Sequence, residues 1–98
     1  MSKSTRDLDA LCLAQEDNVA TVLRAVTAGE TVSVRSGGSI TTVAVRSDIP
    51  LCHKIALKAI RPGQPVIKYG EIIGIATSAI DPGRHVHVHN MRSNRARP

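Results

Sequence analysis

Aromatic side chains are nearly missing from the sequence, which has no Phe, no Trp and a single Tyr (Tyr69) among its 98 residues. The hydrophobic residues make up 42% of the chain, so the core must be built from Val, Ile, Leu and Ala. Val and Ile dominate after residue 30, and β-branched side chains favour strands over helices. A chain of this length predicts one domain with a modest core. We expect that domain to be mostly β.

Long hydrophobic runs and cysteine pairs are also missing. No segment approaches the ~20 apolar residues of a membrane-spanning helix, and the N-terminus, MSKSTRDLDA, lacks the apolar centre of a signal peptide. The two cysteines, Cys12 and Cys52, have no metal-binding spacing and are too few for a disulfide framework. These absences predict a cytoplasmic protein with no membrane span, whose cysteines are small apolar residues in a reducing compartment.

Excess positive charge raises the question of nucleic acid binding. The net charge is +5, and three arginines (Arg92, Arg95 and Arg97) lie in the last seven residues. Base stacking needs aromatic side chains, however, and the sequence shows no helix-turn-helix or zinc-finger pattern. We therefore expect no nucleic acid partner, and interpret the basic tail as solvated or docked on an acidic partner.

An internal repeat organises much of the chain. The segments 22–34, 56–68 and 76–88 each contain Ala, then Val or Ile, then Gly three residues later and Val three residues after the Gly. Pro precedes this Gly in the second and third copies, and Pro-Gly is a turn signal because Pro presets φ and Gly accepts a positive φ. Each copy predicts a turn followed by a strand. The copies are unequally spaced, so we expect a pseudo-repeat within one compact domain.

Two further strands are predicted outside the repeat. They cover SITTVAVR (39–46) and EIIGIAT (71–77), both rich in β-branched residues. Tight turns are expected next to them, at 36–38 and 68–71.

The segment 17–26 has apolar residues at helical spacing. This spacing predicts one or two short helical turns, with Asp17 or Asn18 as the cap. We expect a flexible N-terminal segment at 1–16, a folded domain at 17–91 and a basic C-terminal tail at 92–98.

Three of the chain's four histidines alternate in the segment GRHVHVHN. On a strand, Val86 and Val88 would face the core while His85, His87 and His89 would share the opposite face. Histidines two apart on a strand are roughly 7 Å apart, a separation that two imidazoles can close on one ion. The pattern fits a metal site, an acid–base site or the polar face of a strand, and the spacing leaves all three open.

Several motifs of the C-terminal half occur together. They are His53-Lys54, the Ala-x-x-x-Ile-x-x-Gly turn that follows, KYG (68–70), Ile73-Gly74 and the closing HVHVHN. Together they resemble the SAF-type domain of the altronate dehydratase and galactarate dehydratase family of sugar-acid hydro-lyases. The segment 17–32 is similar to the opening of that domain, so the resemblance covers roughly residues 17–94. The ending HNMRSN is closer to the altronate branch.

The resemblance implies a β-clip fold, as in antifreeze-like domains, and a part in a dehydration that yields a 2-keto-3-deoxy acid. It implies that the chain is the small subunit of a split enzyme, with a separate large catalytic subunit and a sugar-acid substrate. It also implies a divalent metal, iron(II) or manganese(II), held with that partner. The small subunit of sulfolactate sulfo-lyase is similar in plan and is the alternative.

Site roles follow from the motif positions and the residue chemistry. We expect His87 and His89 to be catalytic and His85, His87 and His89 to ligate the metal. Substrate binding is assigned to the remaining polar residues of the motifs: His53, Lys54, Lys68, Tyr69 and Asn90. The lysines would meet the substrate carboxylate as point charges.

A non-catalytic role is the other class of function. SAF domains also serve as binding modules, so the chain could bind a carbohydrate or a protein partner with its histidines as polar surface. Self-association into a homo-oligomer is left open.

Overall fold

A computed structural model describes residues 8–93 and contains strands but no helix in that range. In chain order the strands are β1 (Ala10–Cys12), β2 (Val19–Val22), β3 (Thr31–Ser36), β4 (Ser39–Ala44), β5 (Lys54–Ala56), β6 (Pro65–Lys68), β7 (Glu71–Ala76), β8 (His85–Val86) and β9 (Met91–Ser93). The prediction of a mostly β fold is confirmed, whereas the β-clip assignment stays a prediction.

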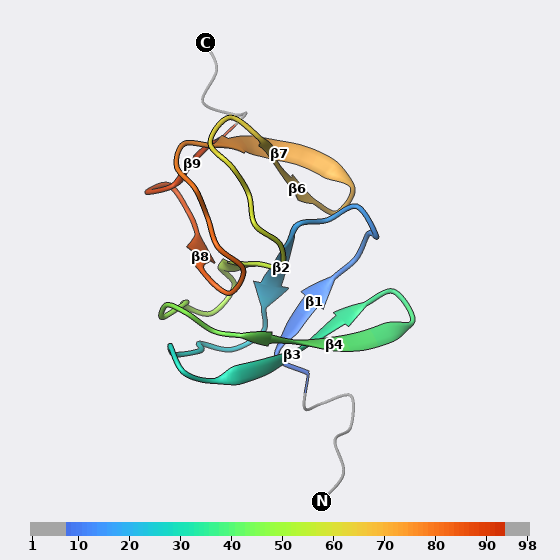
Figure 1. Cartoon of the computed structure of the whole chain (residues 1–98). Helices are drawn as coiled ribbons and strands as arrows, with labels where there is room; N and C mark the ends of the chain where they lie inside the picture. The colour runs from blue at the N-terminus through green and yellow to red at the C-terminus, as the bar shows by residue number, and fades with distance from the viewer. Residues whose placement is uncertain (1–7, 94–98) are drawn as a thin grey trace, which may run out of the picture.

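The strands form two sheets (Figure 1). The larger sheet has the order β4-β3-β1-β2-β5-β8 and the smaller has the order β6-β7-β9. Neighbouring strands are antiparallel except β1 and β3, which are parallel. Tight turns join β3 to β4 and β6 to β7, which confirms the turns expected at 36–38 and 68–71.

Two hydrophobic cores lie side by side, and β2 and β5 contribute to both. The first core contains Ala10, Cys12, Ala20, Val22, Val26, Val32, Val34, Val45, Ile49 and Ile55. The second contains Val19, Ala56, Ile60, Val66, Ala76, Ile80, Val86 and Met91. All these side chains are small or aliphatic, as the lack of aromatic residues requires.

The helical turns predicted at 17–26 are wrong, because this segment contains β2. The residues of β2 are buried on both faces of the strand: Val19 lies in the second core and Val22 in the first. A strand covered on both faces loses the alternation of apolar and polar residues, and its apolar residues can then imitate helical spacing. Leu23, which the helix would bury, is 49% exposed.

The internal repeat predicted from the sequence is visible in the backbone. Gly29, Gly63 and Gly83 all have positive φ, at 99°, 87° and 89°. The Val three residues after each Gly is fully buried, at 0% exposure. Each copy is thus a turn that delivers one buried side chain to a strand.

A fourth copy of this turn was hidden in the sequence. Ile49 and Ile55 flank Cys52 as the apolar residues flank each Gly, and Cys52 has a φ of 72°. Ile49 forms a β-bridge with Val26 of the first copy, just as Ile60 pairs with Ile80. Sequence analysis missed this copy because a cysteine stands where the others have glycine. Cys52 is exposed, whereas Cys12 is buried.

We predict that Cys52→Gly stabilises the fold by about 0.5–1 kcal/mol. A side chain in the left-handed region costs about 1–2 kcal/mol, partly offset by the greater freedom of glycine in the unfolded chain. Urea denaturation under reducing conditions measures the change. Cys52→Ala is the control, since it removes the thiol but keeps the Cβ; a gain of equal size in that variant would contradict the explanation.

The folded part extends beyond the range expected from the sequence. Residues 10–12 form β1 in the centre of the larger sheet, so order begins before residue 17, and β9 includes Arg92 and Ser93 of the predicted tail. Residues 1–7 and 94–98, with Arg95 and Arg97, lie outside the described range. None of the described residues forms a helix that could cross a membrane. The cytoplasmic location stays a prediction.

Candidate functional site

Strand register brings His53 next to the C-terminal histidines. β5 pairs antiparallel with β8, with Lys54 opposite Val86 and Ile55 opposite His85. One step further along the same register, His53 comes opposite His87. Side chains opposite each other in an antiparallel pair lie on the same face.

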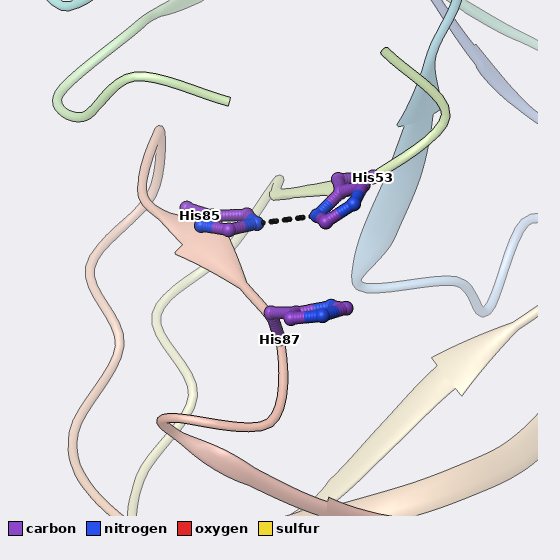
Figure 2. A group of neighbouring side chains, drawn as sticks. All are labelled: His53, His85 and His87. Carbon is purple, nitrogen blue, oxygen red and sulfur yellow. Dashed lines mark hydrogen bonds between the residues drawn. The ribbon is translucent and has the colours of Figure 1, made fainter. Parts of the chain in front are cut away.

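The three imidazoles of His53, His85 and His87 form a compact cluster (Figure 2). His53 Nδ1 and His85 Nε2 are 2.9 Å apart and share a hydrogen bond. The ring of His53 stacks on that of His87 with centroids 4.3 Å apart. One nitrogen from each ring can be chosen so that all three lie within 4.8 Å of one another. The ring of His89 is 5.1 Å from that of His85, but His89 is exposed and outside this group.

A side-chain clamp fixes the turn that carries His87. Asn90 Oδ1 accepts a hydrogen bond from the His87 N–H (3.0 Å), and Asn90 Nδ2 donates one to the His85 carbonyl (2.8 Å). This turn ends β8 after Val86, so the long strand predicted through 85–90 is wrong. Val88 lies on the turn and is 76% exposed, not buried as we expected.

The surroundings favour the neutral form of His85 and His87. Burial, followed by electrostatic repulsion from the neighbouring histidines and Lys54, lowers the pKa of His85 to about 4. Burial and the same kind of neighbours lower the pKa of His87. At neutral pH both rings therefore keep a free lone pair, as a metal ligand or a base requires. None of the groups that shift these pKa values is a carboxylate.

Two lysines lie close to the cluster. Lys54 follows His53 directly, so strand alternation points its side chain to the other side of β5, but its charge still acts on His85 and His87. Lys54 is half-buried, and burial followed by the charge of Lys68 lowers its pKa. The ammonium of Lys68 lies 4.8 Å from the centre of the Tyr69 ring, and the Tyr69 hydroxyl is 3.4 Å from that of Thr21, which pairs with Lys54 across the sheet. Positive charge thus lies close to the nitrogen donors of His85 and His87, which suits an anionic ligand.

Comparison with known protein families adds to this geometry. Residues 8–94 match the model of the altronate/galactarate dehydratase SAF domain. The chain belongs to this family.

Curated relatives of the SAF domain fall into two groups. This chain is 46% identical over 78 residues to altronate dehydratase of Escherichia coli (strain K12) and 38% identical over 80 residues to that of Bacillus subtilis (strain 168). These matches cover 80% and 82% of this chain but only 15% of each dehydratase. It is also 44% identical over 62 residues to the (2R)-sulfolactate sulfo-lyase subunit alpha of Paracoccus pantotrophus, covering 63% of this chain and 92% of that subunit.

The structure brings part of the predicted site residues together. Among the expected metal ligands, His85 and His87 lie in the cluster, whereas His89 lies beside it and His53 takes the third position. The Lys54 charge acts on His85 and His87, whereas Lys68 acts on Lys54 and lies over the Tyr69 ring. Asn90 is engaged by the backbone of its own turn. The assigned roles stay predictions. The hidden fourth turn was the sequence feature that could have predicted the place of His53 in the cluster, because this turn leads into β5, which pairs with β8.

Asp17 is a structural residue that sequence analysis considered only as a helix cap. Its carboxylate is 2% exposed and accepts hydrogen bonds from the N–H groups of Gly70 (2.8 Å), Tyr69 (2.9 Å) and Ala14 (3.2 Å). Burial alone would raise the pKa of Asp17, but these donors and the Cys12 thiol lower it below its ordinary value. Asp17 therefore holds the turn after Lys68 in place.

We predict that Asp17→Ala lowers the free energy of unfolding by about 3 kcal/mol at neutral pH, because three backbone donors lose a charged acceptor. The folded pKa of Asp17 lies below the unfolded one. Its contribution is therefore complete above the unfolded value, near 3.8, and is lost as the pH falls through the folded value. Urea denaturation at several pH values should show the two proteins converging in acid. A difference that stays constant down to pH ~2 would contradict the role of the charge.

Proposed function

We propose that this SAF domain is the small module of a hydro-lyase that removes water from a hydroxy acid to give a 2-keto-3-deoxy acid, with altronate as the leading substrate. The observation that carries the proposal is the cluster of His53, His85 and His87 beside Lys54, on a domain of this family. Imidazoles next to a positively charged lysine suit proton transfer to and from an anionic substrate.

The module acts together with a larger catalytic polypeptide. Dehydration of a hydroxy acid needs a base for the proton α to the carboxylate and help for the departing β-hydroxyl. Among the described residues, the group close enough to share an ion contains histidines only, with no carboxylate. The related domain makes up 15% of two dehydratases and nearly all of a subunit named alpha, which supports a second polypeptide that supplies the missing groups.

The polar residues in and around the cluster have two roles, substrate binding and proton transfer. Lys54 and Lys68 bind the substrate carboxylate as point charges and orient it. His89, exposed at the edge of the cluster, donates a proton to the leaving hydroxyl. Tyr69 lies beside the Lys68 ammonium, and Asn90 positions His87 through the turn.

The family resemblance implies iron(II) or manganese(II), and of these two iron(II) fits the donor set of the cluster better. His53, His85 and His87 would hold it through one nitrogen each, because neutral imidazole is a good ligand for iron, whereas manganese(II) prefers oxygen ligands. The ion would supply Lewis acidity at the substrate oxygens.

A second candidate is supported by the match to the sulfo-lyase alpha subunit, 92% of which the chain covers. In that case the leaving group is sulfite instead of water, and the lysines bind the same carboxylate.

The test is co-expression of the chain with a large polypeptide encoded beside it that carries the rest of the family's enzyme. The purified complex is assayed for 2-oxo acid from altronate and for sulfite from (2R)-sulfolactate, with iron(II) or manganese(II). We expect a stoichiometric complex that dehydrates altronate only when both chains are present. Sulfite release alone would support the second candidate, and a stoichiometric complex in which the large chain is equally active without this chain would support a non-catalytic binding module.

A further inference from the structure

The histidine cluster has the geometry of a metal site before any ion arrives. Nitrogen ligands of one ion at about 2.0–2.1 Å lie roughly 3.3 Å apart in tetrahedral geometry. His53 Nδ1 and His85 Nε2 are already 2.9 Å apart, and all three nitrogens lie within 4.8 Å of one another. The rings are stacked, with 29° between the planes of His53 and His87 and 10° between those of His85 and His87. Side-chain rotation would therefore have to turn the three lone pairs toward one ion, which would replace the proton shared by His53 and His85.

The backbone around the cluster is held in place on both strands. The N–H of His53 donates to the Pro50 carbonyl (3.0 Å), and its carbonyl accepts from the Val22 N–H (2.9 Å). The N–H of His85 donates to Ser47 Oγ at 2.7 Å. Together with the Asn90 clamp, these bonds fix the backbone of all three histidines, so ion binding would order little more than three rings.

The position of the cluster gives an ion a structural role. β8 forms the edge of the larger sheet and pairs with β5 over two residue pairs only. Ile55 of β5 packs in the first core, while Val86 of β8 packs in the second. An ion held by His53, before β5, and by His85 and His87, in and after β8, would clamp this short pairing and with it the two cores.

We propose that His53, His85 and His87 bind one transition-metal ion in the SAF domain alone, without a catalytic partner, and that this ion clamps β8 to β5. The nitrogen-only donor set selects ions that favour imidazole, such as Fe²⁺, Co²⁺, Ni²⁺ and Zn²⁺. It discriminates against Mg²⁺ and Ca²⁺, which prefer oxygen ligands, and ranks Mn²⁺ lowest among the transition metals. The proposal uses the cluster of the proposed function but does not depend on the lyase reaction.

The experiment is a titration of the untagged 98-residue chain with Co²⁺ after removal of metal by EDTA and desalting. We expect one Co²⁺ to bind per chain and to show the visible d–d absorption that is typical of Co²⁺ with a low coordination number. Thermal unfolding should shift upwards by about 10 °C at a Co²⁺ concentration of about 100 times Kd, and Mg²⁺ should leave it unchanged.

Variants identify the ligands. His53→Ala, His85→Ala and His87→Ala should each weaken Co²⁺ binding at least about 10-fold, while His89→Ala, the matched control, should bind as the wild type does. Circular dichroism verifies folding, and His53→Gln repeats the test if an alanine variant is unfolded. Equal binding by the His53 and His89 variants, or an equal thermal shift with Mg²⁺, would overturn the proposal. Metal binding by the chain without turnover in the complex would support this inference and count against the proposed reaction. Turnover in the complex, with a chain that binds no ion by itself, would overturn this inference and support the proposed reaction.

Discussion

Replacing Gly83 with alanine is expected to lower the free energy of unfolding by about 3 kcal/mol, a large share of the ~5–15 kcal/mol that stabilises a small domain. A Cβ at this position would overlap the carbonyl oxygen of Ala44 and lie 3.1 Å from Cγ of Arg46. The backbone here has a φ of 89°, which side chains rarely adopt. The Gly83 N–H donates to the Ala56 carbonyl, and the Gly83 carbonyl accepts from the Arg46 N–H. The turn therefore cannot move away from Ala44 without breaking these hydrogen bonds.

Gly63→Ala is the matched control for Gly83→Ala. Gly63 occupies the same position in its copy of the turn, with a φ of 87°, but a Cβ there would meet nothing within 4 Å. This variant should cost only the backbone strain, about 1–2 kcal/mol. Urea denaturation of both variants separates the cost of backbone strain, which both share, from the cost of steric overlap with Ala44, which only Gly83→Ala has. Equal losses in the two would contradict the close contact between the third turn and the end of β4.

The second large effect is expected for His53→Ala in the assembled enzyme, where turnover should fall by about 10²–10⁴-fold. His53 contributes one of three nitrogens to the cluster and stacks on His87. Its loss removes a ligand or proton carrier that no other described residue replaces within the cluster. Steady-state kinetics of the complex measures kcat and KM, and co-purification verifies that the variant still assembles.

Lys58→Ala is the control for His53→Ala, because Lys58 is exposed and lies just beyond β5 without belonging to the cluster. It should leave kcat within about twofold, as expected for a surface change away from the site. Wild-type kcat in an assembled His53→Ala complex would show that the cluster takes no part in turnover and would favour the binding-module alternative.

Sequence patterns predicted the parts of the fold that depend on local chemistry. The Pro-Gly turns, the buried valines of the repeat and the two tight turns follow from backbone preferences and strand alternation, and the structure confirms them. The segment 17–26 was misassigned because β2 is buried on both faces, a property set by the two cores rather than by the strand itself. Val88 was misplaced because the Asn90 clamp turns the chain after two strand residues.

The candidate site was predicted only in part for a similar reason. Alternation alone brought His85 and His87 together, since both lie on one face of a short extended segment. His53 is separated from His85 by 32 positions, and its place in the cluster follows from the pairing of β5 with β8. That pairing depends on the fourth turn, which Cys52 concealed. Register between distant strands is fixed by packing, which a single sequence does not display.

The most direct test of the central claim, that His53 completes a three-histidine site, is anomalous diffraction from a crystal of the chain grown with Co²⁺. We predict one strong anomalous peak bounded by His53, His85 and His87, about 2.0–2.2 Å from one nitrogen of each. A peak at His89 without His53, or no peak at the cluster in a crystal that holds cobalt elsewhere, would contradict the account.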